Sequence, residues 1–306
     1  MTLRTRWLAW RRDVVAFAVL CVAGVVFGLL INRTGPRLHS ALASWAPGLA
    51  RHVTIDADAN DSSLPPLTQA DPWTYRAPIS PGQRVWVRNV VGPVSVEPTT
   101  GSFVEIRAVK SFRHSNPASV ALVATPNREG LAVCAVGVDS LVCAPSVEIT
   151  GPHHHSDVAV AFTLRVPHGV RIDIATVSGA VRVRGASAPV TVRTVNGAID
   201  AETNAGPVNA VTVNGSVRAI VRGFGDTGSV QLATVNGAVT AELPAHLDAV
   251  VDAATLHGRV VSDFPLTVEN ALVAHRASGT LGTGGRKVEL HTVNGSVRLL
   301  EVPPEP

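Results

Sequence analysis

Aromatic residues are scarce in this chain and unevenly placed. Phe, Trp and Tyr together make up 4% of its 306 residues. All five tryptophans lie within the first 86 positions: Trp7, Trp10, Trp45, Trp73 and Trp86. The remainder is rich in Val, Ala, Thr and Gly, residues that suit pleated strands and tight turns. The composition therefore favours β-structure downstream of the N-terminal region.

No charge of one sign dominates the chain. It has 26 basic and 23 acidic residues and a formal net charge of +3. These charges are interspersed outside the N-terminus, whereas a nucleic-acid-binding surface needs a clustered basic face. The G-x-S-x-G, P-loop and H-E-x-x-H motifs are also absent from the sequence. We therefore expect no nucleic-acid partner and no cofactor, and no motif assigns catalytic residues.

Cysteine is nearly absent, with three residues in the whole chain. Cys21 lies in an apolar run and is interpreted as an apolar membrane residue. Cys134 and Cys143 lie in "LAVCAVGVDSLVCAP". In an oxidising compartment, two antiparallel strands joined by a loop at residues 137–140 would bring them together as a structural disulfide. The alternative is a pair of unlinked buried thiols; a redox function is not expected without a C-x-x-C motif.

The N-terminus has the pattern of a membrane anchor. Four arginines precede an uncharged apolar run at residues 14–31. As a helix this run would rise about 27 Å, close to the roughly 30 Å of a bilayer core. The arginines predict a cytoplasmic N-terminus, so the rest of the chain would lie on the opposite, extracytoplasmic side of the membrane. The alternative is a signal peptide cleaved after the A-x-A at Ala41 and Ala43.

The sequence divides into five segments. They are a basic cytoplasmic N-terminus, a transmembrane anchor, a linker with room for a short helix, a repeat domain and a proline-rich tail: residues 1–13, 14–31, 32–82, 83–300 and 301–306. The linker is rich in Asp, Ser, Pro and Gln, as flexible tethers are.

The repeat domain contains several copies of one tetrapeptide. "TVNG" ends at Gly197, Gly215, Gly237 and Gly295, "TVSG" ends at Gly179, and "TLHG" ends at Gly258. Successive glycines are 18, 18, 22, 21 and 37 residues apart. An earlier copy has Gly92 in the same position, and the last gap contains a degenerate copy at Gly279. Internal repeats of about this period indicate a solenoid.

Valines flanking each glycine distinguish a coil corner from a hairpin. A valine or leucine stands two residues before each glycine, and a valine or isoleucine stands two residues after it. In a two-residue Asn-Gly hairpin, these residues would lie on opposite faces of a sheet. At a corner of a climbing coil both can point inward. The pattern predicts an all-β fold, a single-stranded right-handed parallel β-helix, with an antiparallel sandwich as the alternative.

Each letter of the tetrapeptide then has an expected structural role. Gly supplies the positive φ of a tight corner, stacked Asn side chains form amide ladders, and Thr faces outward to hydrogen-bond its copies. The predicted corner residues are Gly92, Gly179, Asn196, Gly197, Asn214, Gly215, Asn236, Gly237, Gly258, Asn294 and Gly295. Residues 97–165 lack clear corners, and the sequence leaves open whether they form wider coils or a capping sheet. The prolines of the tail are expected to protect the last edge.

From Val85 to Leu300 the chain resembles a family of bacterial β-strand-repeat proteins of unknown function, often labelled as candidate adhesins. The similarity is carried by "VRNVVGPVSVE", by "FTLRVPHGVRIDIATVSGAVRV" and by the "TVNG" copies. The resemblance implies a membrane-tethered or exported β-helical domain of the bacterial envelope. It implies no catalytic residues.

Parallel β-helices also include polysaccharide lyases and hydrolases, so a glycan-active enzyme is the alternative function. Such sites need clustered carboxylates, and the acidic residues here are sparse along the repeats. Three adjacent histidines, His153, His154 and His155, are weak candidates for Zn²⁺ binding, with an exposed polar turn as the default. We expect a non-enzymatic envelope protein that binds a protein or glycan or serves as a stress-associated scaffold. The oligomeric state is not predictable from the sequence.

Overall fold

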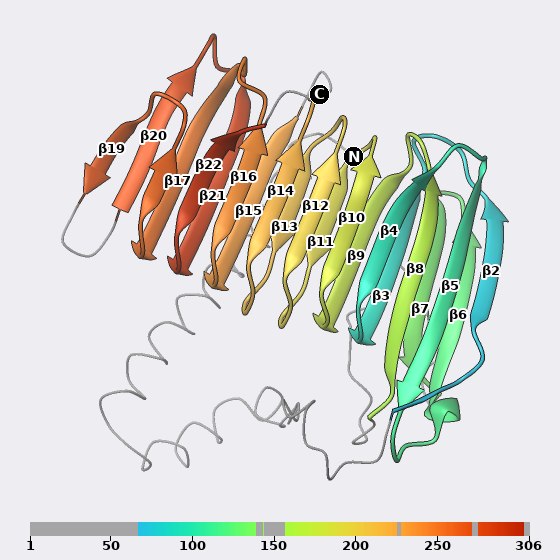
Figure 1. Cartoon of the computed structure of the whole chain (residues 1–306). Helices are drawn as coiled ribbons and strands as arrows, with labels where there is room; N and C mark the ends of the chain where they lie inside the picture. Colours follow the sequence, from blue (N-terminus) through green and yellow to red (C-terminus); the bar gives the residue numbers. More distant parts are fainter. Residues whose placement is uncertain (1–66, 139–142, 144–156, 225–227, 271–274, 303–306) are drawn as a thin grey trace, which may run out of the picture. The chain divides into compact units, whose positions relative to one another are not determined.

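The computed structural model describes residues 67–138, 143, 157–224, 228–270 and 275–302 (Figure 1). These residues form strands and one 3₁₀ turn, η2 (Pro117–Ser119). The described strands belong to two sheets of 11 strands each. The all-β class is therefore confirmed.

The first sheet, sheet A, contains every second strand of the repeats. Its strands are β1 (Thr68–Gln69), β2 (Trp73–Pro78), β4 (Val94–Thr99), β5 (Phe103–Phe112), β8 (Ala159–Pro167), β10 (Val181–Ala186), β12 (Ile199–Thr203), β14 (Val217–Val221), β16 (Val239–Leu243), β18 (Val260–Ser262) and β22 (Val297–Glu301). Their spatial order is β1-β5-β8-β4-β10-β12-β14-β16-β22-β18, with β2 paired to β5.

The second sheet, sheet B, contains the strands between them. These are β3 (Arg84–Val91), β6 (Val120–Asn127), β7 (Gly130–Gly137), β9 (Arg171–Ser178), β11 (Val190–Arg193), β13 (Val208–Val211), β15 (Ser229–Asn236), β17 (Ala249–His257), β19 (Thr267–Asn270), β20 (His275–Leu281) and β21 (Arg286–Asn294). Their spatial order is β19-β20-β17-β21-β15-β13-β11-β9-β3-β7-β6.

From β9 to β16 the chain alternates between the sheets, so each repeat contributes one strand to each. Equivalent strands of successive repeats pair in parallel and in register: Val190 lies opposite Val208, which lies opposite Val230. The Asn-Gly at 196–197 connects β11 in sheet B to β12 in sheet A. A two-residue hairpin would have joined neighbours within one sheet. The repeated Asn-Gly therefore marks a corner between stacked coils.

The core lies between the two sheets and is filled by alternate residues of each strand. In β12 and β13, for example, Ile199, Ala201, Val208 and Ala210 are almost completely buried, while the residues between them are more exposed. Small Val and Ala side chains dominate this core, which agrees with the scarcity of aromatic residues. Each coil alone could not bury its apolar side chains, so stacking supplies the burial.

Antiparallel strands cap the end of the stack that comes first in the sequence. β5 pairs antiparallel with both β8 and β2, and β6 pairs antiparallel with β7. Within residues 97–165, which the sequence left open, these strands form the cap, while β7 and β8 also pair in parallel with coil strands. β1 and β2 fall inside the predicted linker of residues 32–82. Residues 68–69 and 73–78 of that segment are therefore strands and not linker; in β2, Trp73, Tyr75 and Ala77 alternate with more exposed residues as in a strand with one face covered.

The coils do not stack in sequence order at the other end. β21 lies between β15 and β17, and β22 lies between β16 and β18, so the last coil, dark red in Figure 1, stands between two earlier ones. Gly279, expected at a corner, lies within β20, which runs antiparallel to β17 and pairs with Val251. That prediction is wrong, because β20 reverses direction instead of starting a new coil. β22, the strand before the proline tail, lies between β16 and β18 and is interior; residues 303–306 of the tail lie outside the described residues.

Several predicted features lie outside the described residues. These are the N-terminal segments 1–13 and 14–31, the first part of the linker, and the three histidines at 153–155. In the part of the chain that is described, no helix has the length and apolar character required to cross a membrane.

Candidate binding surfaces

The corner residues form a continuous stack along one edge of the coils. Asn214 donates from Nδ2 to Oδ1 of Asn196, and Asn236 donates in the same way to Asn214, both at 2.8 Å. Asn294 then donates to Asn236, also at 2.8 Å. Each amide side chain therefore bridges to its copy in the neighbouring coil. His257 occupies the Asn position of the next coil, where its carbonyl accepts a hydrogen bond from the Gly295 N–H.

Glycine is required at these corners because the backbone of the neighbouring coil is close. A Cβ atom on Gly215 would lie 2.2 Å from the carbonyl oxygen of Gly197. Gly215 also has a φ of +153°, a conformation that other residues rarely adopt. Its N–H donates to the carbonyl oxygen of Asn236 at 2.9 Å. The corner is therefore closed by backbone contact on both sides.

The threonine of each copy points inward, contrary to the expectation that it faces solvent. Its six occurrences are buried: Thr176, Thr194, Thr212, Thr234, Thr255 and Thr292. The Oγ1 of Thr234 donates to the carbonyl oxygen of Gly215 at 2.9 Å, and Thr292 donates to Gly237 at the same distance. The first copy has the buried Asn89 in this position, which donates to the carbonyl oxygens of Gly92 and Val160. In four of the six copies, threonine therefore satisfies a corner carbonyl from inside: Thr212, Thr234, Thr255 and Thr292.

The valine before each Asn-Gly is correspondingly less buried than expected. Val195 is 42% exposed, and Val177, Val213 and Val235 are partly exposed. Side chains alternate along the chain, so an inward Thr turns the next residue outward. The expectation that valines on both sides of the glycine point inward is wrong for the first of them. The residue two positions after the glycine is buried at Val181, Ile199, Val217, Val239 and Val297.

The outer face of sheet A carries a network of ion pairs. Arg184 lies 2.6 Å from Asp200, and Arg218 lies 2.6 Å from Glu242. Arg222 bridges to Glu202 at 3.0 Å. The hydrogen bond to Asp200 raises the pKa of Arg184 above its ordinary value. The charges on this face neutralise one another across neighbouring coils.

The outer face of sheet B carries a row of uncharged and acidic hydrogen-bonding groups, which we call the polar row. Strand register places its members opposite one another in adjacent strands: Thr191, Asn209, Gln231, Glu289 and Asp252. Asn209 donates to Oε1 of Gln231 at 3.3 Å, and Gln231 donates to Oε2 of Glu289 at 2.7 Å. All five side chains are partly exposed. The row runs across the strands of successive coils.

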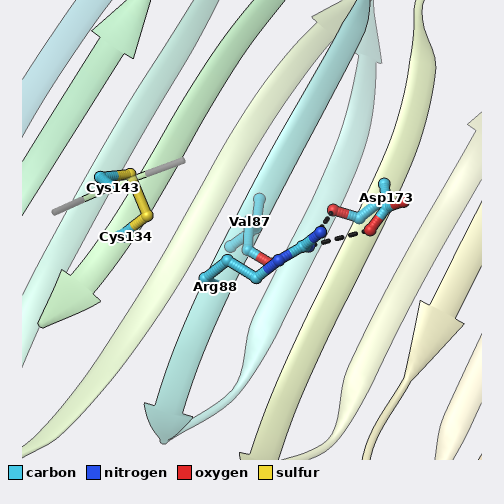
Figure 2. Close-up of a disulfide and its surroundings, with 5 residues drawn as sticks. All are labelled: Val87, Arg88, Cys134, Cys143 and Asp173. Atoms are coloured by element: carbon cyan, nitrogen blue, oxygen red, sulfur yellow. Dashed lines mark hydrogen bonds and ion pairs between the residues drawn. A yellow bond between two sulfur atoms is a disulfide. The ribbon is translucent and has the colours of Figure 1, made fainter. Parts of the chain in front are cut away.

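The same face carries the disulfide (Figure 2). Cys134 and Cys143 are linked, with a Cα–Cα separation of 5.7 Å. They pack with Trp86 and Ala132 in a small cluster outside the main core. Cys134 lies in β7, which pairs with β3 and β6, so the bridge does not join two paired strands as expected. The disulfide instead attaches residue 143 to the outer face of sheet B.

A second close contact on this face is a largely buried ion pair. Arg88 in β3 contacts Asp173 in β9 at 2.8 Å, and Figure 2 shows the guanidinium group pointing to that carboxylate. Arg84 lies 3.9 Å from the other carboxylate oxygen. Asp173 occupies the position next to Thr191 in strand register. The polar row therefore begins beside a neutralised acidic group.

A cleft of about 350 Å³ in the cap is lined by residues that include Trp73, Lys110 and Leu122. Burial lowers the pKa of Lys110, whose Nζ donates to the carbonyl oxygens of Pro117 and Val120. Among the described residues, no three His, Cys, Asp or Glu side chains are grouped as metal ligands. Lys110 therefore acts within the cap as a donor to backbone.

The repeat pattern and the stacked corners agree with one family. Residues 151–300 match the family model Toastrack DUF4097. The expected resemblance to a β-strand-repeat family of unknown function is confirmed. The Toastrack match covers the coils from β8 to β22 and includes all but the first of the predicted corners. Comparison with curated proteins gives no match.

Two solved structures are similar to this chain. One is a candidate cell adhesion protein from Clostridium sporogenes, with 9% identity, a TM-score of 0.42 and coverage of 76% of this chain and 100% of that chain. The other is a candidate adhesin from Bacteroides fragilis, with 8% identity, a TM-score of 0.27 and coverage of 76% and 97%. Similarity at these TM-scores is too low to support an inference about function.

The polar row was not predicted from the sequence. Its members differ in residue type from coil to coil, so they escape a search for identical letters. The signal that could have found them is the column three residues before the threonine of each tetrapeptide, read across the repeats. Thr191, Asn209 and Gln231 stand in this column, each directly after a buried valine of a sheet B strand.

Proposed function

We propose that this chain is a non-enzymatic binding protein of the cell envelope, an adhesin-like protein whose polar row binds glycan. In this proposal residues 14–31 anchor the chain in the inner membrane. The repeat domain forms a right-handed parallel β-helix in the periplasm. The observation that carries the proposal is the polar row on the outer face of sheet B.

The chemistry of the row suits hydroxyl-rich ligands. A side-chain amide offers two N–H donors and a carbonyl acceptor, and a carboxylate accepts at two oxygens. Asn209 and Gln231 use one donor each in contacts along the row. Adjacent strands are about 4.8 Å apart, so the row presents hydrogen-bonding groups at a short, regular interval. A glycan lying along the coils would meet one such group in each coil.

The two outer faces differ in what they leave available to a ligand. On sheet A, arginines and carboxylates pair with each other, as Arg218 does with Glu242. A ligand there would have to compete with ion pairs already formed. On sheet B, Asp252 at the end of the row is paired with Arg276 at 2.8 Å. Asn209 and Gln231 contact each other through their amides, and Glu289 accepts one hydrogen bond, from Gln231. The Glu289 carboxylate can accept further charge-assisted bonds from sugar hydroxyls. We therefore favour sheet B.

Glycan binding can be tested with face-specific variants. The purified chain is applied to an array of bacterial and host glycans, together with N209A/Q231A and a matched sheet A control, R218A/E242A. Both pairs lie in the same two coils. We expect wild-type binding to fall at least tenfold in N209A/Q231A and to persist in the control. Absence of any bound glycan, or loss of binding in the control alone, would contradict the proposal; cleavage of a bound polysaccharide would contradict its non-enzymatic part.

Export can be tested separately. A reporter that is active only in the periplasm is fused after residue 60, and a matched fusion carries a deletion of residues 14–31. We expect activity from the first fusion and its loss in the second. An inactive first fusion with normal expression would refute export and leave the glycan result unaffected.

A further inference from the structure

The last coil of the chain is inserted between two earlier coils. We call residues 286–301, which comprise β21 and β22, the C-terminal coil. Its neighbours are the coil of β15 and β16 on one side and the coil of β17 and β18 on the other. The gap that it fills is called the slot. The two coils that form the slot are consecutive in sequence, yet they do not pair with each other in the described structure.

The C-terminal coil meets both walls of the slot in the same register. Val288 lies opposite Val230 on one side and Val251 on the other. Asn294 lies opposite Asn236 and His257 in the corner stack. In sheet A, Val297 lies opposite Val239 and Val260. The slot therefore recognises the repeat pattern itself, and the same sixteen residues of another copy would make identical contacts.

The connector before the C-terminal coil is suited to opening. Leu281 at the end of β20 and Arg286 at the start of β21 both lie opposite Ala249, from its two sides. Residues 282–285 therefore pass over the start of β17. Three of these four residues are glycines with positive φ values of 55°, 76° and 100°. Glycine accepts such conformations freely and also many others, so the connector can change path without steric strain.

One side-chain contact fastens the connector in its present path. The Thr283 N–H donates to Oδ1 of Asp248 at 2.7 Å. Asp248 lies just before β17, on the wall over which the connector passes. This contact is exposed, and an exposed hydrogen bond adds little stability.

We propose that the C-terminal coil is exchanged between two copies of this chain, so that each slot is filled by residues 286–301 of the other copy. In such a dimer each slot keeps the strand pairing and side-chain packing that it has in the monomer. Domain swapping of this kind costs little when a flexible connector joins the exchanged element to the rest. The extended connector spans about 13 Å, which is enough to lead to a neighbouring copy. The exchange does not depend on the proposed glycan binding.

The test uses cysteines at two neighbouring corners. The Val239 N–H donates to the Ser296 carbonyl at 2.9 Å, and the Val297 N–H donates to the Arg259 carbonyl at 2.9 Å. Residue 296 therefore lies between residues 238 and 259. Full-length A238C and S296C chains, both in a C21S background in detergent, are mixed in urea, refolded together over a range of concentrations and oxidised. A mixture of A238C and R259C chains is the matched control.

If the coils exchange, we expect A238C and S296C chains to form a covalent dimer. The fraction of this dimer should rise with protein concentration and should be at least fivefold larger than in the control mixture. In the control, both substituted positions lie in slot walls and neither is carried by the exchanged coil. Exchange therefore does not bring the cysteines of the two chains together in one slot. A covalent dimer at the control level at every concentration would overturn the proposal. So would efficient cross-linking of A238C with R259C. If the variants fail to refold, light scattering measures the molar mass of the refolded wild-type chain instead. A monomer at every concentration would contradict the proposed exchange.

Discussion

Threonine and glycine have complementary roles at the corners. The threonine side chain lies in the core, and the glycine lets the backbone of the neighbouring coil approach. Thr234 donates its hydroxyl hydrogen to Gly215, while Gly215 lies against the Gly197 carbonyl. The threonine therefore holds a carbonyl of the neighbouring coil, and the glycine leaves room for that coil to approach. Both roles recur at the same height in the coils of Thr212, Thr234, Thr255 and Thr292, which accounts for the repeated Thr and Gly of the tetrapeptide there.

The value of the threonine hydroxyl can be measured with a matched pair. Thr234→Val removes the hydrogen bond to Gly215, and we expect a loss of about 1 kcal/mol in the free energy of unfolding. Thr194 is buried to the same degree, but its Oγ1 has no partner among the described residues. Thr194→Val should be neutral or stabilising. Urea unfolding of both variants measures the difference, and equal losses would contradict the assigned role of the hydroxyl.

The space around the corner glycine gives a second test. In Gly215→Ala the new Cβ would lie 2.2 Å from the Gly197 carbonyl oxygen, so the two coils must separate. We expect a loss of about 3 kcal/mol or more, at the upper end of overpacking effects. Gly137→Ala is the control, because a Cβ there meets nothing within 4 Å. Thermal unfolding that shifts equally in both variants would argue against close coil contact.

At the scale of single elements, the cap depends on a loop held by one carboxylate. Asp157, just before β8, accepts backbone N–H groups of His114 at 2.8 Å, of Ser115 at 3.0 Å and of Arg113 at 3.1 Å. Burial alone would raise the pKa of Asp157. The hydrogen bonds from the His114 backbone, the Ser115 side chain and the remaining backbone groups outweigh it and lower the pKa to about 2. The carboxylate fastens the turn after β5 to the start of β8.

This carboxylate makes part of the stability depend on pH. The folded pKa lies below the ordinary value of 3.8, so the contribution is complete above pH 3.8 and is lost as pH falls towards 2. Because the side chain is about one-third exposed, we expect only about 1 kcal/mol. Asp157→Asn should therefore be less stable at pH 7 and equal to wild type near pH 2. Urea unfolding at both values checks this, and a difference that is independent of pH would count against it.

The elements also show what the sequence could predict. The corners were predictable because Asn196, Asn214 and Asn236 repeat at a regular spacing, and a ladder follows from that regularity. The inward direction of the threonine side chain was not predictable. Side chains alternate between the two faces of a strand, and the sequence does not show at which residue the bend interrupts this alternation. The antiparallel cap was ambiguous, since β5 and β8 have the same alternating pattern as coil strands. The position of β21 between β15 and β17 could not be predicted for a related reason. Its sequence pairs in register with both of these strands, so the repeat pattern does not distinguish this position from one at the end of the stack.

At the scale of the whole molecule, the stack behaves as a quasi-one-dimensional scaffold, in which each coil is stabilised by its neighbours. Two outer faces result: sheet A carries a network of ion pairs, and sheet B carries the polar row with an ion pair near each end, Arg88–Asp173 and Arg276–Asp252. The residues of a face come from many repeats, so changes in single coils alter the surface without altering the winding. The repeated tetrapeptide therefore determines the fold of the stack, whereas the variable residues on the outer faces determine what the surface can bind.

The repeated Asn-Gly pairs are corners between stacked coils, and amide hydrogen exchange tests this assignment most directly. The N–H groups of Gly197, Gly215, Gly237 and Gly295 each donate to a carbonyl of the neighbouring coil at 2.9 Å. We predict that these four amides exchange as slowly as those of Val217 and Val239, which start strands inside sheet A. Exchange of the glycine amides within seconds, while the strand amides remain protected, would contradict the stacking of coils at these corners.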